Sequence, residues 1–361
     1  MLIEKNIQSI TESYVDKNYF NTVDLLFKKN DKVFVSTTYE NGLWATFKAN
    51  QNPLFDIASL TKIITTTGTL RLITEKKLHL NTPLRDILPL QENLKKIENI
   101  TVKELLTHSS GLRAWFPFYS LETRDFIEAL SAGIDLFHHS DKNYVYSDLN
   151  FMLLGEIIQS ASNMNLSDFV KEKIAKPLHC ESLSYGPINP KKRAVPTELG
   201  NLTEKGMVQE RHLSFEGWRP FGQPIQGEVN DGNAYYFFNG IAGHAGLFGN
   251  VHDMERILNL YLKGGHLKGE RFIDYNLVRL SLSHLAGNRG LGWHSGEPFP
   301  TGFGHTGFTG TSIWLDRNYG LTGVILTNRL NVDSPKNIND YRMDIHQEIL
   351  KNAINEGDKD V

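Results

Sequence analysis

Ser59 and Lys62 are the two residues whose types and spacing most directly suggest chemistry. They lie in the stretch 55–64, which reads FDIASLTKII. In a helix, residues i and i+3 share a face, so the Lys62 ammonium would reach the Ser59 hydroxyl. A serine attacks a carbonyl only when a neighbouring group takes its proton or a cation withdraws charge. The pair predicts a nucleophilic serine at the N-terminus of a buried helix extending to Glu75, although this spacing alone also arises by chance.

Tyr146 and Asp148 lie directly before a second stretch, 150–160, whose apolar pattern predicts a helix. An ammonium close to a tyrosine favours the phenolate, which can then act as a general base. The alternative role for Tyr146 is core packing, which is more common for a tyrosine in such a position. A location near Lys62 would favour the catalytic role.

The triplet His305-Thr306-Gly307 precedes a predicted strand over 312–315. A glycine beside a strand lets a ligand approach the strand edge closely. The backbone N–H of Phe308, paired with that of Ser59, would form a two-donor oxyanion hole. The triplet alone means little, because glycine-containing turns before strands are common.

The elements that must position these residues change type along the chain. Strands are predicted near both ends, within 23–39 around an Asn-Asp turn and over 312–315 and 321–327. Amphipathic or buried helices are expected at the N-terminus and over 59–75, 101–106, 150–160, 166–174, 254–262 and 340–354. Strands at both ends with helices between them favour an α/β (α+β) fold.

This order of elements predicts one discontinuous domain over residues 1–361. Its α/β part would comprise about 1–80 and 285–361, with a helical, loop-rich part inserted at about 81–284. We expect the site in the cleft between these parts. Residues 186–250 are rich in Gly, Pro, Asn and aromatic residues with little periodicity, which is typical of binding loops, and 190–240 is a candidate lid.

The composition is that of an ordinary globular protein, with 361 residues, 40% hydrophobic, 22% charged and a net charge of −3. This balance, without a basic stripe, argues against nucleic acid as a partner. No window approaches the roughly 18 apolar residues of a membrane span, and no signal peptide is evident, so we expect a cytoplasmic protein without a membrane partner. The single cysteine, Cys180, excludes an intrachain disulfide and is expected to be buried.

The 13 histidines do not have the spacing of a metal site. His138 and His139 are adjacent rather than one helical turn apart, and no paired cysteines occur. We therefore expect neither a metal nor another cofactor.

Three motifs occur together in one order: Ser-x-x-Lys from Ser59, Tyr-x-Asp from Tyr146 and His-Thr-Gly from His305. This combination resembles the serine β-lactamase and penicillin-binding protein superfamily, specifically its branch of class C β-lactamase-like hydrolases and esterases. The resemblance runs from Val23 to Asn328 and implies a β-lactamase/transpeptidase-like fold, in which helices flank an antiparallel sheet built from both termini. Further matches are LLTHSSGL at 105–112, LLG at 153–155 and PL at 177–178.

The resemblance implies a role for each motif residue. Ser59 would be the acylated nucleophile, and Lys62 would shuttle its proton. Tyr146 would be the general base of acylation and would help to activate water in deacylation. The triplet His305-Thr306-Gly307 would line the strand edge along which the substrate lies.

Two positions depart from the best-known pattern. Penicillin-recognising relatives usually carry a lysine where His305 stands, and a histidine is mostly neutral at pH 7. Asp148 replaces the usual asparagine, and its charge would hold Lys62 protonated and repel a substrate carboxylate. Because a charged Lys62 is a poor base, the role of base falls to Tyr146. Both departures argue against efficient turnover of β-lactams or D-alanyl-D-alanine.

Residues 227–234 and 240–248 are similar to one sub-branch of the family, as is the stretch from Leu112 to Tyr119 that contains Trp115. That sub-branch includes the N-acetylmuramyl-L-alanine amidases of peptidoglycan recycling. Two residues of the first stretch, Asp231 and Asn233, would bind sugar or peptide groups, or alternatively serve only as turn residues. His244 would contact substrate or bond only to backbone.

Three hypotheses follow. The first is a metal-independent serine hydrolase that forms an acyl-enzyme with a small amide or ester, with muropeptide fragments the most natural amides. The second is a carboxylesterase for small acyl esters, and the third is a non-catalytic sensor of the same fold. A wide polar groove near Asp231 and Asn233 would favour a muropeptide, whereas a narrow apolar slot at Trp115, Phe116 and Tyr236 would favour esters. The oligomeric state does not follow from the sequence.

Overall fold

The computed structural model describes residues 2–40, 42–45, 52–132, 135–137 and 144–357. The strands are β1 (Thr22–Lys29), β2 (Lys32–Glu40), β3 (Leu43–Ala45), β4 (Phe55–Asp56), β5 (Ser184–Tyr185), β6 (Leu247–Gly249), β7 (His266–Leu267), β8 (Glu270–Arg271), β9 (Phe303–Thr306), β10 (Ser312–Asp316) and β11 (Leu321–Thr327). The α-helices are α1 (Leu2–Val15), α2 (Thr61–Thr74), α3 (Val102–Leu106), α4 (Phe126–Leu130), α5 (Asp148–Ser162), α6 (Leu166–Phe169), α7 (Leu202–Glu210), α8 (Val251–Leu262), α9 (Tyr275–Ser281) and α10 (Asn339–Gly357). Short 3-10 or π turns include η1 (Ala58–Leu60), η5 (Val170–Ala175) and η7 (Asn233–Phe237).

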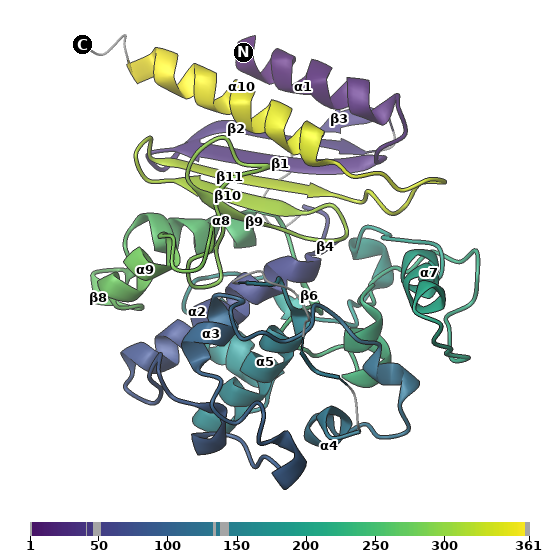
Figure 1. Ribbon diagram of the computed structural model, residues 1–361. Helices are drawn as coiled ribbons and strands as arrows, with labels where there is room; N and C mark the ends of the chain where they lie inside the picture. The colour runs from purple at the N-terminus through teal and green to yellow at the C-terminus, as the bar shows by residue number, and fades with distance from the viewer. Residues whose placement is uncertain (1, 41, 46–51, 133–134, 138–143, 358–361) are drawn as a thin grey trace.

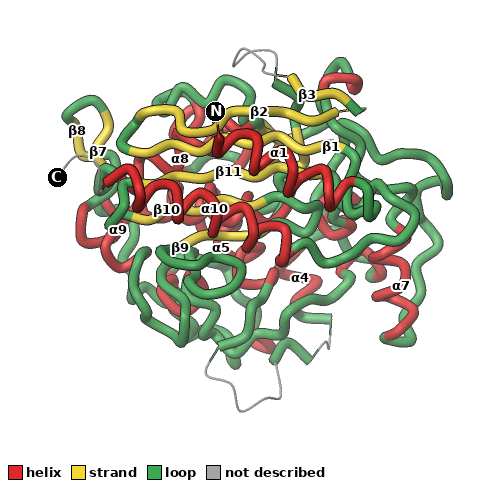
Figure 2. Tube along the Cα trace, turned by 90° about the horizontal axis from the view of Figure 1, so that it is seen from above, coloured by secondary structure: helices red, strands yellow, loops and turns green. Residues whose placement is uncertain are grey.

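A six-stranded antiparallel sheet in the order β3-β2-β1-β11-β10-β9 lies directly beneath α1 and α10 in Figure 1. β1 pairs with β11 from Val23 opposite Thr327 to Lys29 opposite Leu321, so the two ends of the chain meet in the middle of the sheet. α1 and α10 lie side by side across one face of the sheet (Figure 2). This architecture confirms the predicted fold class.

β1 shows why both faces of the sheet are covered. Val23, Leu25 and Phe27 pack in the cluster formed with α1 and α10, whereas Leu26 joins the larger core on the opposite face. This alternation is the two-residue period of a strand buried on both sides. On the opposite face α8 packs against β1, β10 and β11, and the helical part of the chain lies beyond it (Figure 1).

α2 is the buried helix at the centre of the helical part, where it packs against α5. Every residue from Thr61 to Leu70 is buried, and the threonine hydroxyls among them need partners in this apolar surrounding. Thr67 donates to the carbonyl of Ile63 at 2.7 Å, and Thr65 donates to that of Gly243 at 2.7 Å. The second of these bonds fixes α2 to the loop that carries His244.

Most predicted elements are present, and the structure adds others that were not predicted, among them the helices α4, α7 and α9. The capping box predicted at Thr101 opens α3, and the expected helices at the N-terminus and near 150–160, 254–262 and 340–354 are α1, α5, α8 and α10. The stretch 186–250, predicted to be irregular, contains the helix α7. No helix in the described residues is both long and apolar enough to cross a membrane.

Candidate active site

Ser59 lies in a turn between β4 and α2. The α-helix begins at Thr61 rather than at Ser59, which lies in the preceding 3-10 turn η1. Ala58 has a φ of +47°, a left-handed conformation that costs a residue other than glycine roughly 1–2 kcal/mol. The Asp56 carboxylate holds this turn, because it accepts hydrogen bonds from the N–H of Ala58 at 2.9 Å and of Asn230 at 2.7 Å.

Lys62 is fully buried beside Ser59, as the spacing predicted. Its ammonium donates to Ser59 Oγ at 2.9 Å and to the backbone carbonyl of His244 at 3.1 Å, and it forms an ion pair with Asp148 at 2.8 Å. Burial alone would lower the pKa of Lys62, but the neighbouring Asp148 and Tyr146 outweigh it and raise that pKa above its ordinary value. Lys62 is therefore charged at neutral pH.

The carbonyl of His244 reaches Lys62 because Gly243 allows its loop to approach α5. A Cβ atom on Gly243 would clash with the carbonyl of Phe151 and lie 2.9 Å from the nitrogen of Gly155. Only a residue without a side chain fits there.

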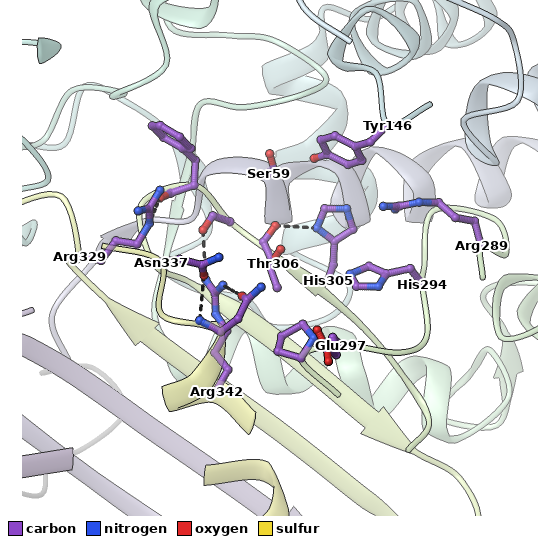
Figure 3. A pocket seen from close by; sticks show the side chains of 14 residues that line it. Ser59, Tyr146, Arg289, His294, Glu297, His305, Thr306, Arg329, Asn337 and Arg342 are labelled. Atoms are coloured by element: carbon purple, nitrogen blue, oxygen red, sulfur yellow. Dashed lines mark hydrogen bonds between the residues drawn. The ribbon is translucent and has the colours of Figure 1, made fainter. Parts of the chain in front are cut away.

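Tyr146 lies at the start of α5, and Figure 3 shows its side chain next to Ser59. The Lys62 ammonium lies 5.1 Å from the centroid of the Tyr146 ring, and the guanidinium carbon of Arg289 lies 5.0 Å from it. The ring of His305 lies 5.9 Å away, measured between centroids. Two cations thus lie close to the ring of a tyrosine that, as a general base, would carry negative charge during the reaction.

The β9–β10 turn is fixed to the turn that carries Ser59. The hydroxyls of Thr309 and Thr311 donate to the backbone carbonyls of Asp56 and Ile57 at 2.8 and 3.0 Å. Gly307 permits this contact, because a Cβ atom there would clash with Thr311 and lie 2.8 Å from the Ile57 carbonyl oxygen. The two segments predicted to supply the oxyanion hole are therefore held together by their own hydrogen bonds.

A cavity of about 480 Å³ opens in front of Ser59 (Figure 3). Its walls are polar and apolar in about equal measure and include Tyr146, Arg289, His294, the strand edge His305-Thr306-Gly307 and Phe308. Burial, with the charges of His294, Arg289 and Lys62, lowers the pKa of His305 well below its ordinary value, so this imidazole is neutral. Burial likewise lowers the pKa of His294 to about 4.

Three arginines line this cavity, and the sequence analysis found none of them. Arg342 is buried and donates to the carbonyls of Gly307 and Thr311, and Arg329 donates to that of Phe308 at 2.6 Å. Both arginines thus support the β9–β10 turn. Arg289 differs, because its Nε and Nη1 are buried without a hydrogen-bond partner among the described residues.

Arg289 reaches the cavity through pairing at the edge of the sheet. His294 exchanges backbone hydrogen bonds with Gly304 of β9 at 3.1 and 2.8 Å, and Arg289 pairs in turn with His294. No local motif marks this loop, so only the tertiary structure reveals the position of Arg289. His305 supplies no fixed cation, whereas Arg289 places one in the same cavity.

The other predicted substrate-binding residues lie away from this cavity. Asn233 is fully buried, donates to the carbonyl of Phe116 and accepts from the N–H of Phe118, so it holds two loops together. Trp115 is buried in the core. The carboxylate of Asp231 bonds His244 Nε2 at 2.9 Å, so these two side chains are paired with each other. The polar groove and the apolar slot considered above therefore do not describe the cavity.

Cys180 is buried, as expected. Within the described ranges, no group of three or more His, Cys, Asp and Glu side chains has the arrangement of a metal site. His138 and His139 lie outside the described residues.

Residues 25–348 match the beta-lactamase family. The chain belongs to that family. N-acetylmuramyl-L-alanine amidase of Bacillus subtilis (strain 168) is 29% identical over 331 residues, which cover 82% of this chain and 73% of the relative. A protein of Salmonella enteritidis, provisionally named D-alanyl-D-alanine carboxypeptidase, is 28% identical over 78% of this chain and 71% of its own length.

Solved structures of the family share the fold. D-amino acid amidase from Ochrobactrum anthropi superposes with a TM-score of 0.71 over 98% of this chain and 100% of its own, at 18% identity. As a member of the beta-lactamase family with amidase relatives, the chain is a serine hydrolase. The predicted resemblance is confirmed.

Proposed function

We propose that the chain is an amidase that forms an acyl-enzyme at Ser59 and cleaves small peptide-like amides that carry a carboxylate, of the muropeptide-fragment class. The observation that carries this proposal is Arg289, which lines the same cavity as Ser59 and whose Nε and Nη1 have no hydrogen-bond partner among the described residues. Burying a guanidinium without a hydrogen-bond partner costs free energy. A carboxylate can accept two parallel hydrogen bonds from its N–H groups. A small neutral ester would leave those donors unused.

The arrangement around Ser59 supports the following acylation step. Tyr146, starting as the phenolate, takes the hydroxyl proton as Ser59 Oγ attacks the amide carbon, and the carbonyl oxygen becomes an oxyanion bonded by the N–H groups of Ser59 and Phe308. The C–N bond then breaks as Tyr146 passes its proton to the amine, which leaves. Lys62 stays charged throughout, because Asp148 holds its proton, and stabilises the negative charge on Ser59 and Tyr146.

Deacylation repeats these steps with water. Water gives a proton to the Tyr146 phenolate and attacks the acyl carbon, and the ester bond to Ser59 breaks as Tyr146 passes that proton to Ser59. The acid product leaves the cavity. No step requires a metal ion.

The relative named N-acetylmuramyl-L-alanine amidase supports an amide substrate over an ester, since it aligns with most of this chain. Muropeptide fragments also carry carboxylates near their amide bonds, which suits Arg289. The carboxylate repulsion expected from Asp148 is reduced, because the Asp148 carboxylate is paired with Lys62.

The test compares wild type, Ser59→Ala and the control Ser36→Ala on muramyl dipeptide and on p-nitrophenyl butyrate. We expect wild type and Ser36→Ala to release free dipeptide, and Ser59→Ala to lose at least about 10³-fold in kcat. Turnover of the ester alone, equally dependent on Ser59, would replace the amidase with a carboxylesterase. Ligand binding without turnover of either substrate would favour a non-catalytic sensor.

A further inference from the structure

His108 is a buried histidine from the LLTHSSGL motif that the proposed reaction does not use. It is 0% exposed and has a φ of +57°, in the left-handed region. Its ring lies against that of Tyr146, with centroids 4.6 Å apart and planes inclined by 37°.

The same residue holds the backbone on both sides of Tyr146. The carbonyl of His108 accepts from the N–H of Val145 at 2.9 Å, and its Nδ1 accepts from the N–H of Ser147 at 3.0 Å. One residue thus fixes the backbone before Tyr146, the backbone after it and the plane of its ring.

These contacts define the protonation state of His108. Nδ1 accepts a hydrogen bond from a backbone N–H, so it carries no proton, and in a neutral imidazole the proton lies on Nε2. Burial, together with the charges of Arg289 and Lys62, lowers the pKa of His108 well below its ordinary value. Burial and the cations from the neighbouring elements therefore keep the ring neutral, and the acceptor at Nδ1 persists at neutral pH.

We propose that His108 is a positioning residue for Tyr146, which sets the place of the phenol relative to Ser59 without touching the substrate. This inference rests on the proposed role of Tyr146 as the base. A displacement of about 1 Å in a reacting group can cost on the order of 10²-fold in rate, so loss of the contacts should appear in kcat. KM should change little, because His108 is not among the residues that line the cavity.

Two substitutions separate the two kinds of contact. His108→Phe keeps a ring against Tyr146 but removes the acceptor for the Ser147 N–H. His108→Asn offers an amide oxygen in place of Nδ1 and tolerates the left-handed backbone, but removes the ring. We expect His108→Phe to lower kcat by about 10²-fold and His108→Asn by about tenfold, each with KM within about threefold of wild type.

The deciding measurement is a double-mutant cycle with Tyr146→Phe, assayed with p-nitrophenyl butyrate so that the natural substrate need not be known. If His108 acts through Tyr146, adding His108→Phe to Tyr146→Phe lowers kcat by less than about threefold. If His108 has a merely structural role, His108→Phe should lower kcat by the same factor in the Tyr146→Phe background as in wild type. That result would overturn the proposal. An inactive but folded Tyr146→Phe enzyme is assayed by the rate at which a fluorophosphonate labels Ser59.

Hydrogen exchange of the segment around Ser147 provides the second measurement. Exchange should accelerate in His108→Phe and stay slow in His108→Asn, because only the latter retains an acceptor. The control His252→Phe removes a partly buried histidine on α8 whose Nε2 has no hydrogen-bond partner among the described residues, and it should leave kcat unchanged. Faster exchange with unchanged kcat in His108→Phe would refute positioning, whereas a Tyr146→Phe enzyme as active as wild type would refute the proposed function.

Discussion

The two sides of Ser59 carry opposite charge and use it differently. On the α2 and α5 side, Asp148 pairs with Lys62, the Asp56 carboxylate accepts two backbone N–H groups, and Asp231 bonds His244. On the β9 side, the cavity is lined by arginines, and the Nε and Nη1 atoms of Arg289 have no hydrogen-bond partner in the part of the chain that the structure describes. The first side pairs its charged groups with one another and so fits a fixed catalytic arrangement, whereas the guanidinium of Arg289 lines the cavity and so fits the proposed recognition of an anion.

Burial shifts pKa values on both sides of Ser59, upward for a carboxyl and downward for basic groups. It raises the pKa of the Asp56 carboxyl to about 6, and on the other side it lowers the pKa of Arg342 to about 9 and makes His305 neutral. Lys62 is the exception, because close negative partners outweigh its burial. A charge is therefore maintained in this site only where a partner lies within hydrogen-bond distance or, at Arg289, where the substrate would provide one.

The largest effect is expected from Lys62→Met on the catalytic side. The substitution removes the cation beside Ser59 and should lower kcat by about 10³-fold or more. It also leaves the Asp148 carboxylate unpaired, which should lower the free energy of unfolding by about 3–5 kcal/mol. Urea unfolding and steady-state kinetics measure the two effects.

Lys62→Met combined with Asp148→Asn separates stability from catalysis. Removing both charges should restore most of the lost stability, because no unpaired charge remains, while kcat stays low. Recovery of kcat in the double variant would show that Lys62 is dispensable for the reaction.

The next largest effect on activity is expected from Arg289→Met on the β9 side, which we propose recognises the substrate carboxylate. Methionine keeps much of the side-chain volume and removes the guanidinium. Hydrogen bonds to a charged group contribute about 1.5–3 kcal/mol, so kcat/KM for muramyl dipeptide should fall by about 10- to 100-fold. For neutral p-nitrophenyl butyrate, kcat/KM should change by less than about threefold.

Arg271→Met, on the exposed strand β8, is the matched control and should leave both substrates unaffected. An equal loss on both substrates in Arg289→Met would instead assign the guanidinium to Tyr146, over whose ring it lies. That outcome would remove the distinction between the two sides.

The two sides also differ in how far the sequence could predict them. Ser59 and Lys62 lie one helical turn apart, so local geometry alone predicts their contact, and Tyr146 and Asp148 follow from a motif beside a helix. Arg289 could not be predicted, because its place depends on pairing between its loop and the edge strand β9. Asn233 was predicted to bind substrate, but burial makes its amide a link between loops.

A smaller effect tests the charge of Asp56. Protonation of this carboxyl, whose pKa is about 6, weakens one of its two bonds to backbone N–H groups and should loosen the turn at Ala58. We expect kcat of wild type to decline below about pH 6, by less than about tenfold, and the decline to be absent in Asp56→Asn. Ser59→Ala provides the background rate at each pH.

Although kcat should fall as pH decreases below about 6, the stability contributed by Asp56 should rise. The pKa of Asp56 is higher in the folded than in the unfolded protein, whose value is about 3.9, so the folded state binds the proton more tightly. The stability contributed by this group is greatest below about pH 4 and is lost as pH rises through 6. The unfolding free energy of wild type minus that of Asp56→Asn should therefore fall from pH 4 to 7, and a rise would contradict the burial argument.

The smallest effect on activity is expected at the hydrogen bonds that join the β9–β10 turn to the turn carrying Ser59. Thr309→Val removes the hydroxyl that bonds the Asp56 carbonyl and leaves that buried carbonyl with one partner fewer, at a cost of about 1–3 kcal/mol in stability. Both predicted oxyanion donors are backbone groups and remain, so kcat should fall by less than about tenfold, with KM unchanged. The control Thr69→Val removes a similarly buried hydroxyl bond within α2 and should cost stability without changing kcat. If both variants lose the same stability and neither loses kcat, the bonds between the β9–β10 turn and the Ser59 turn hold the fold together but do not set the oxyanion hole.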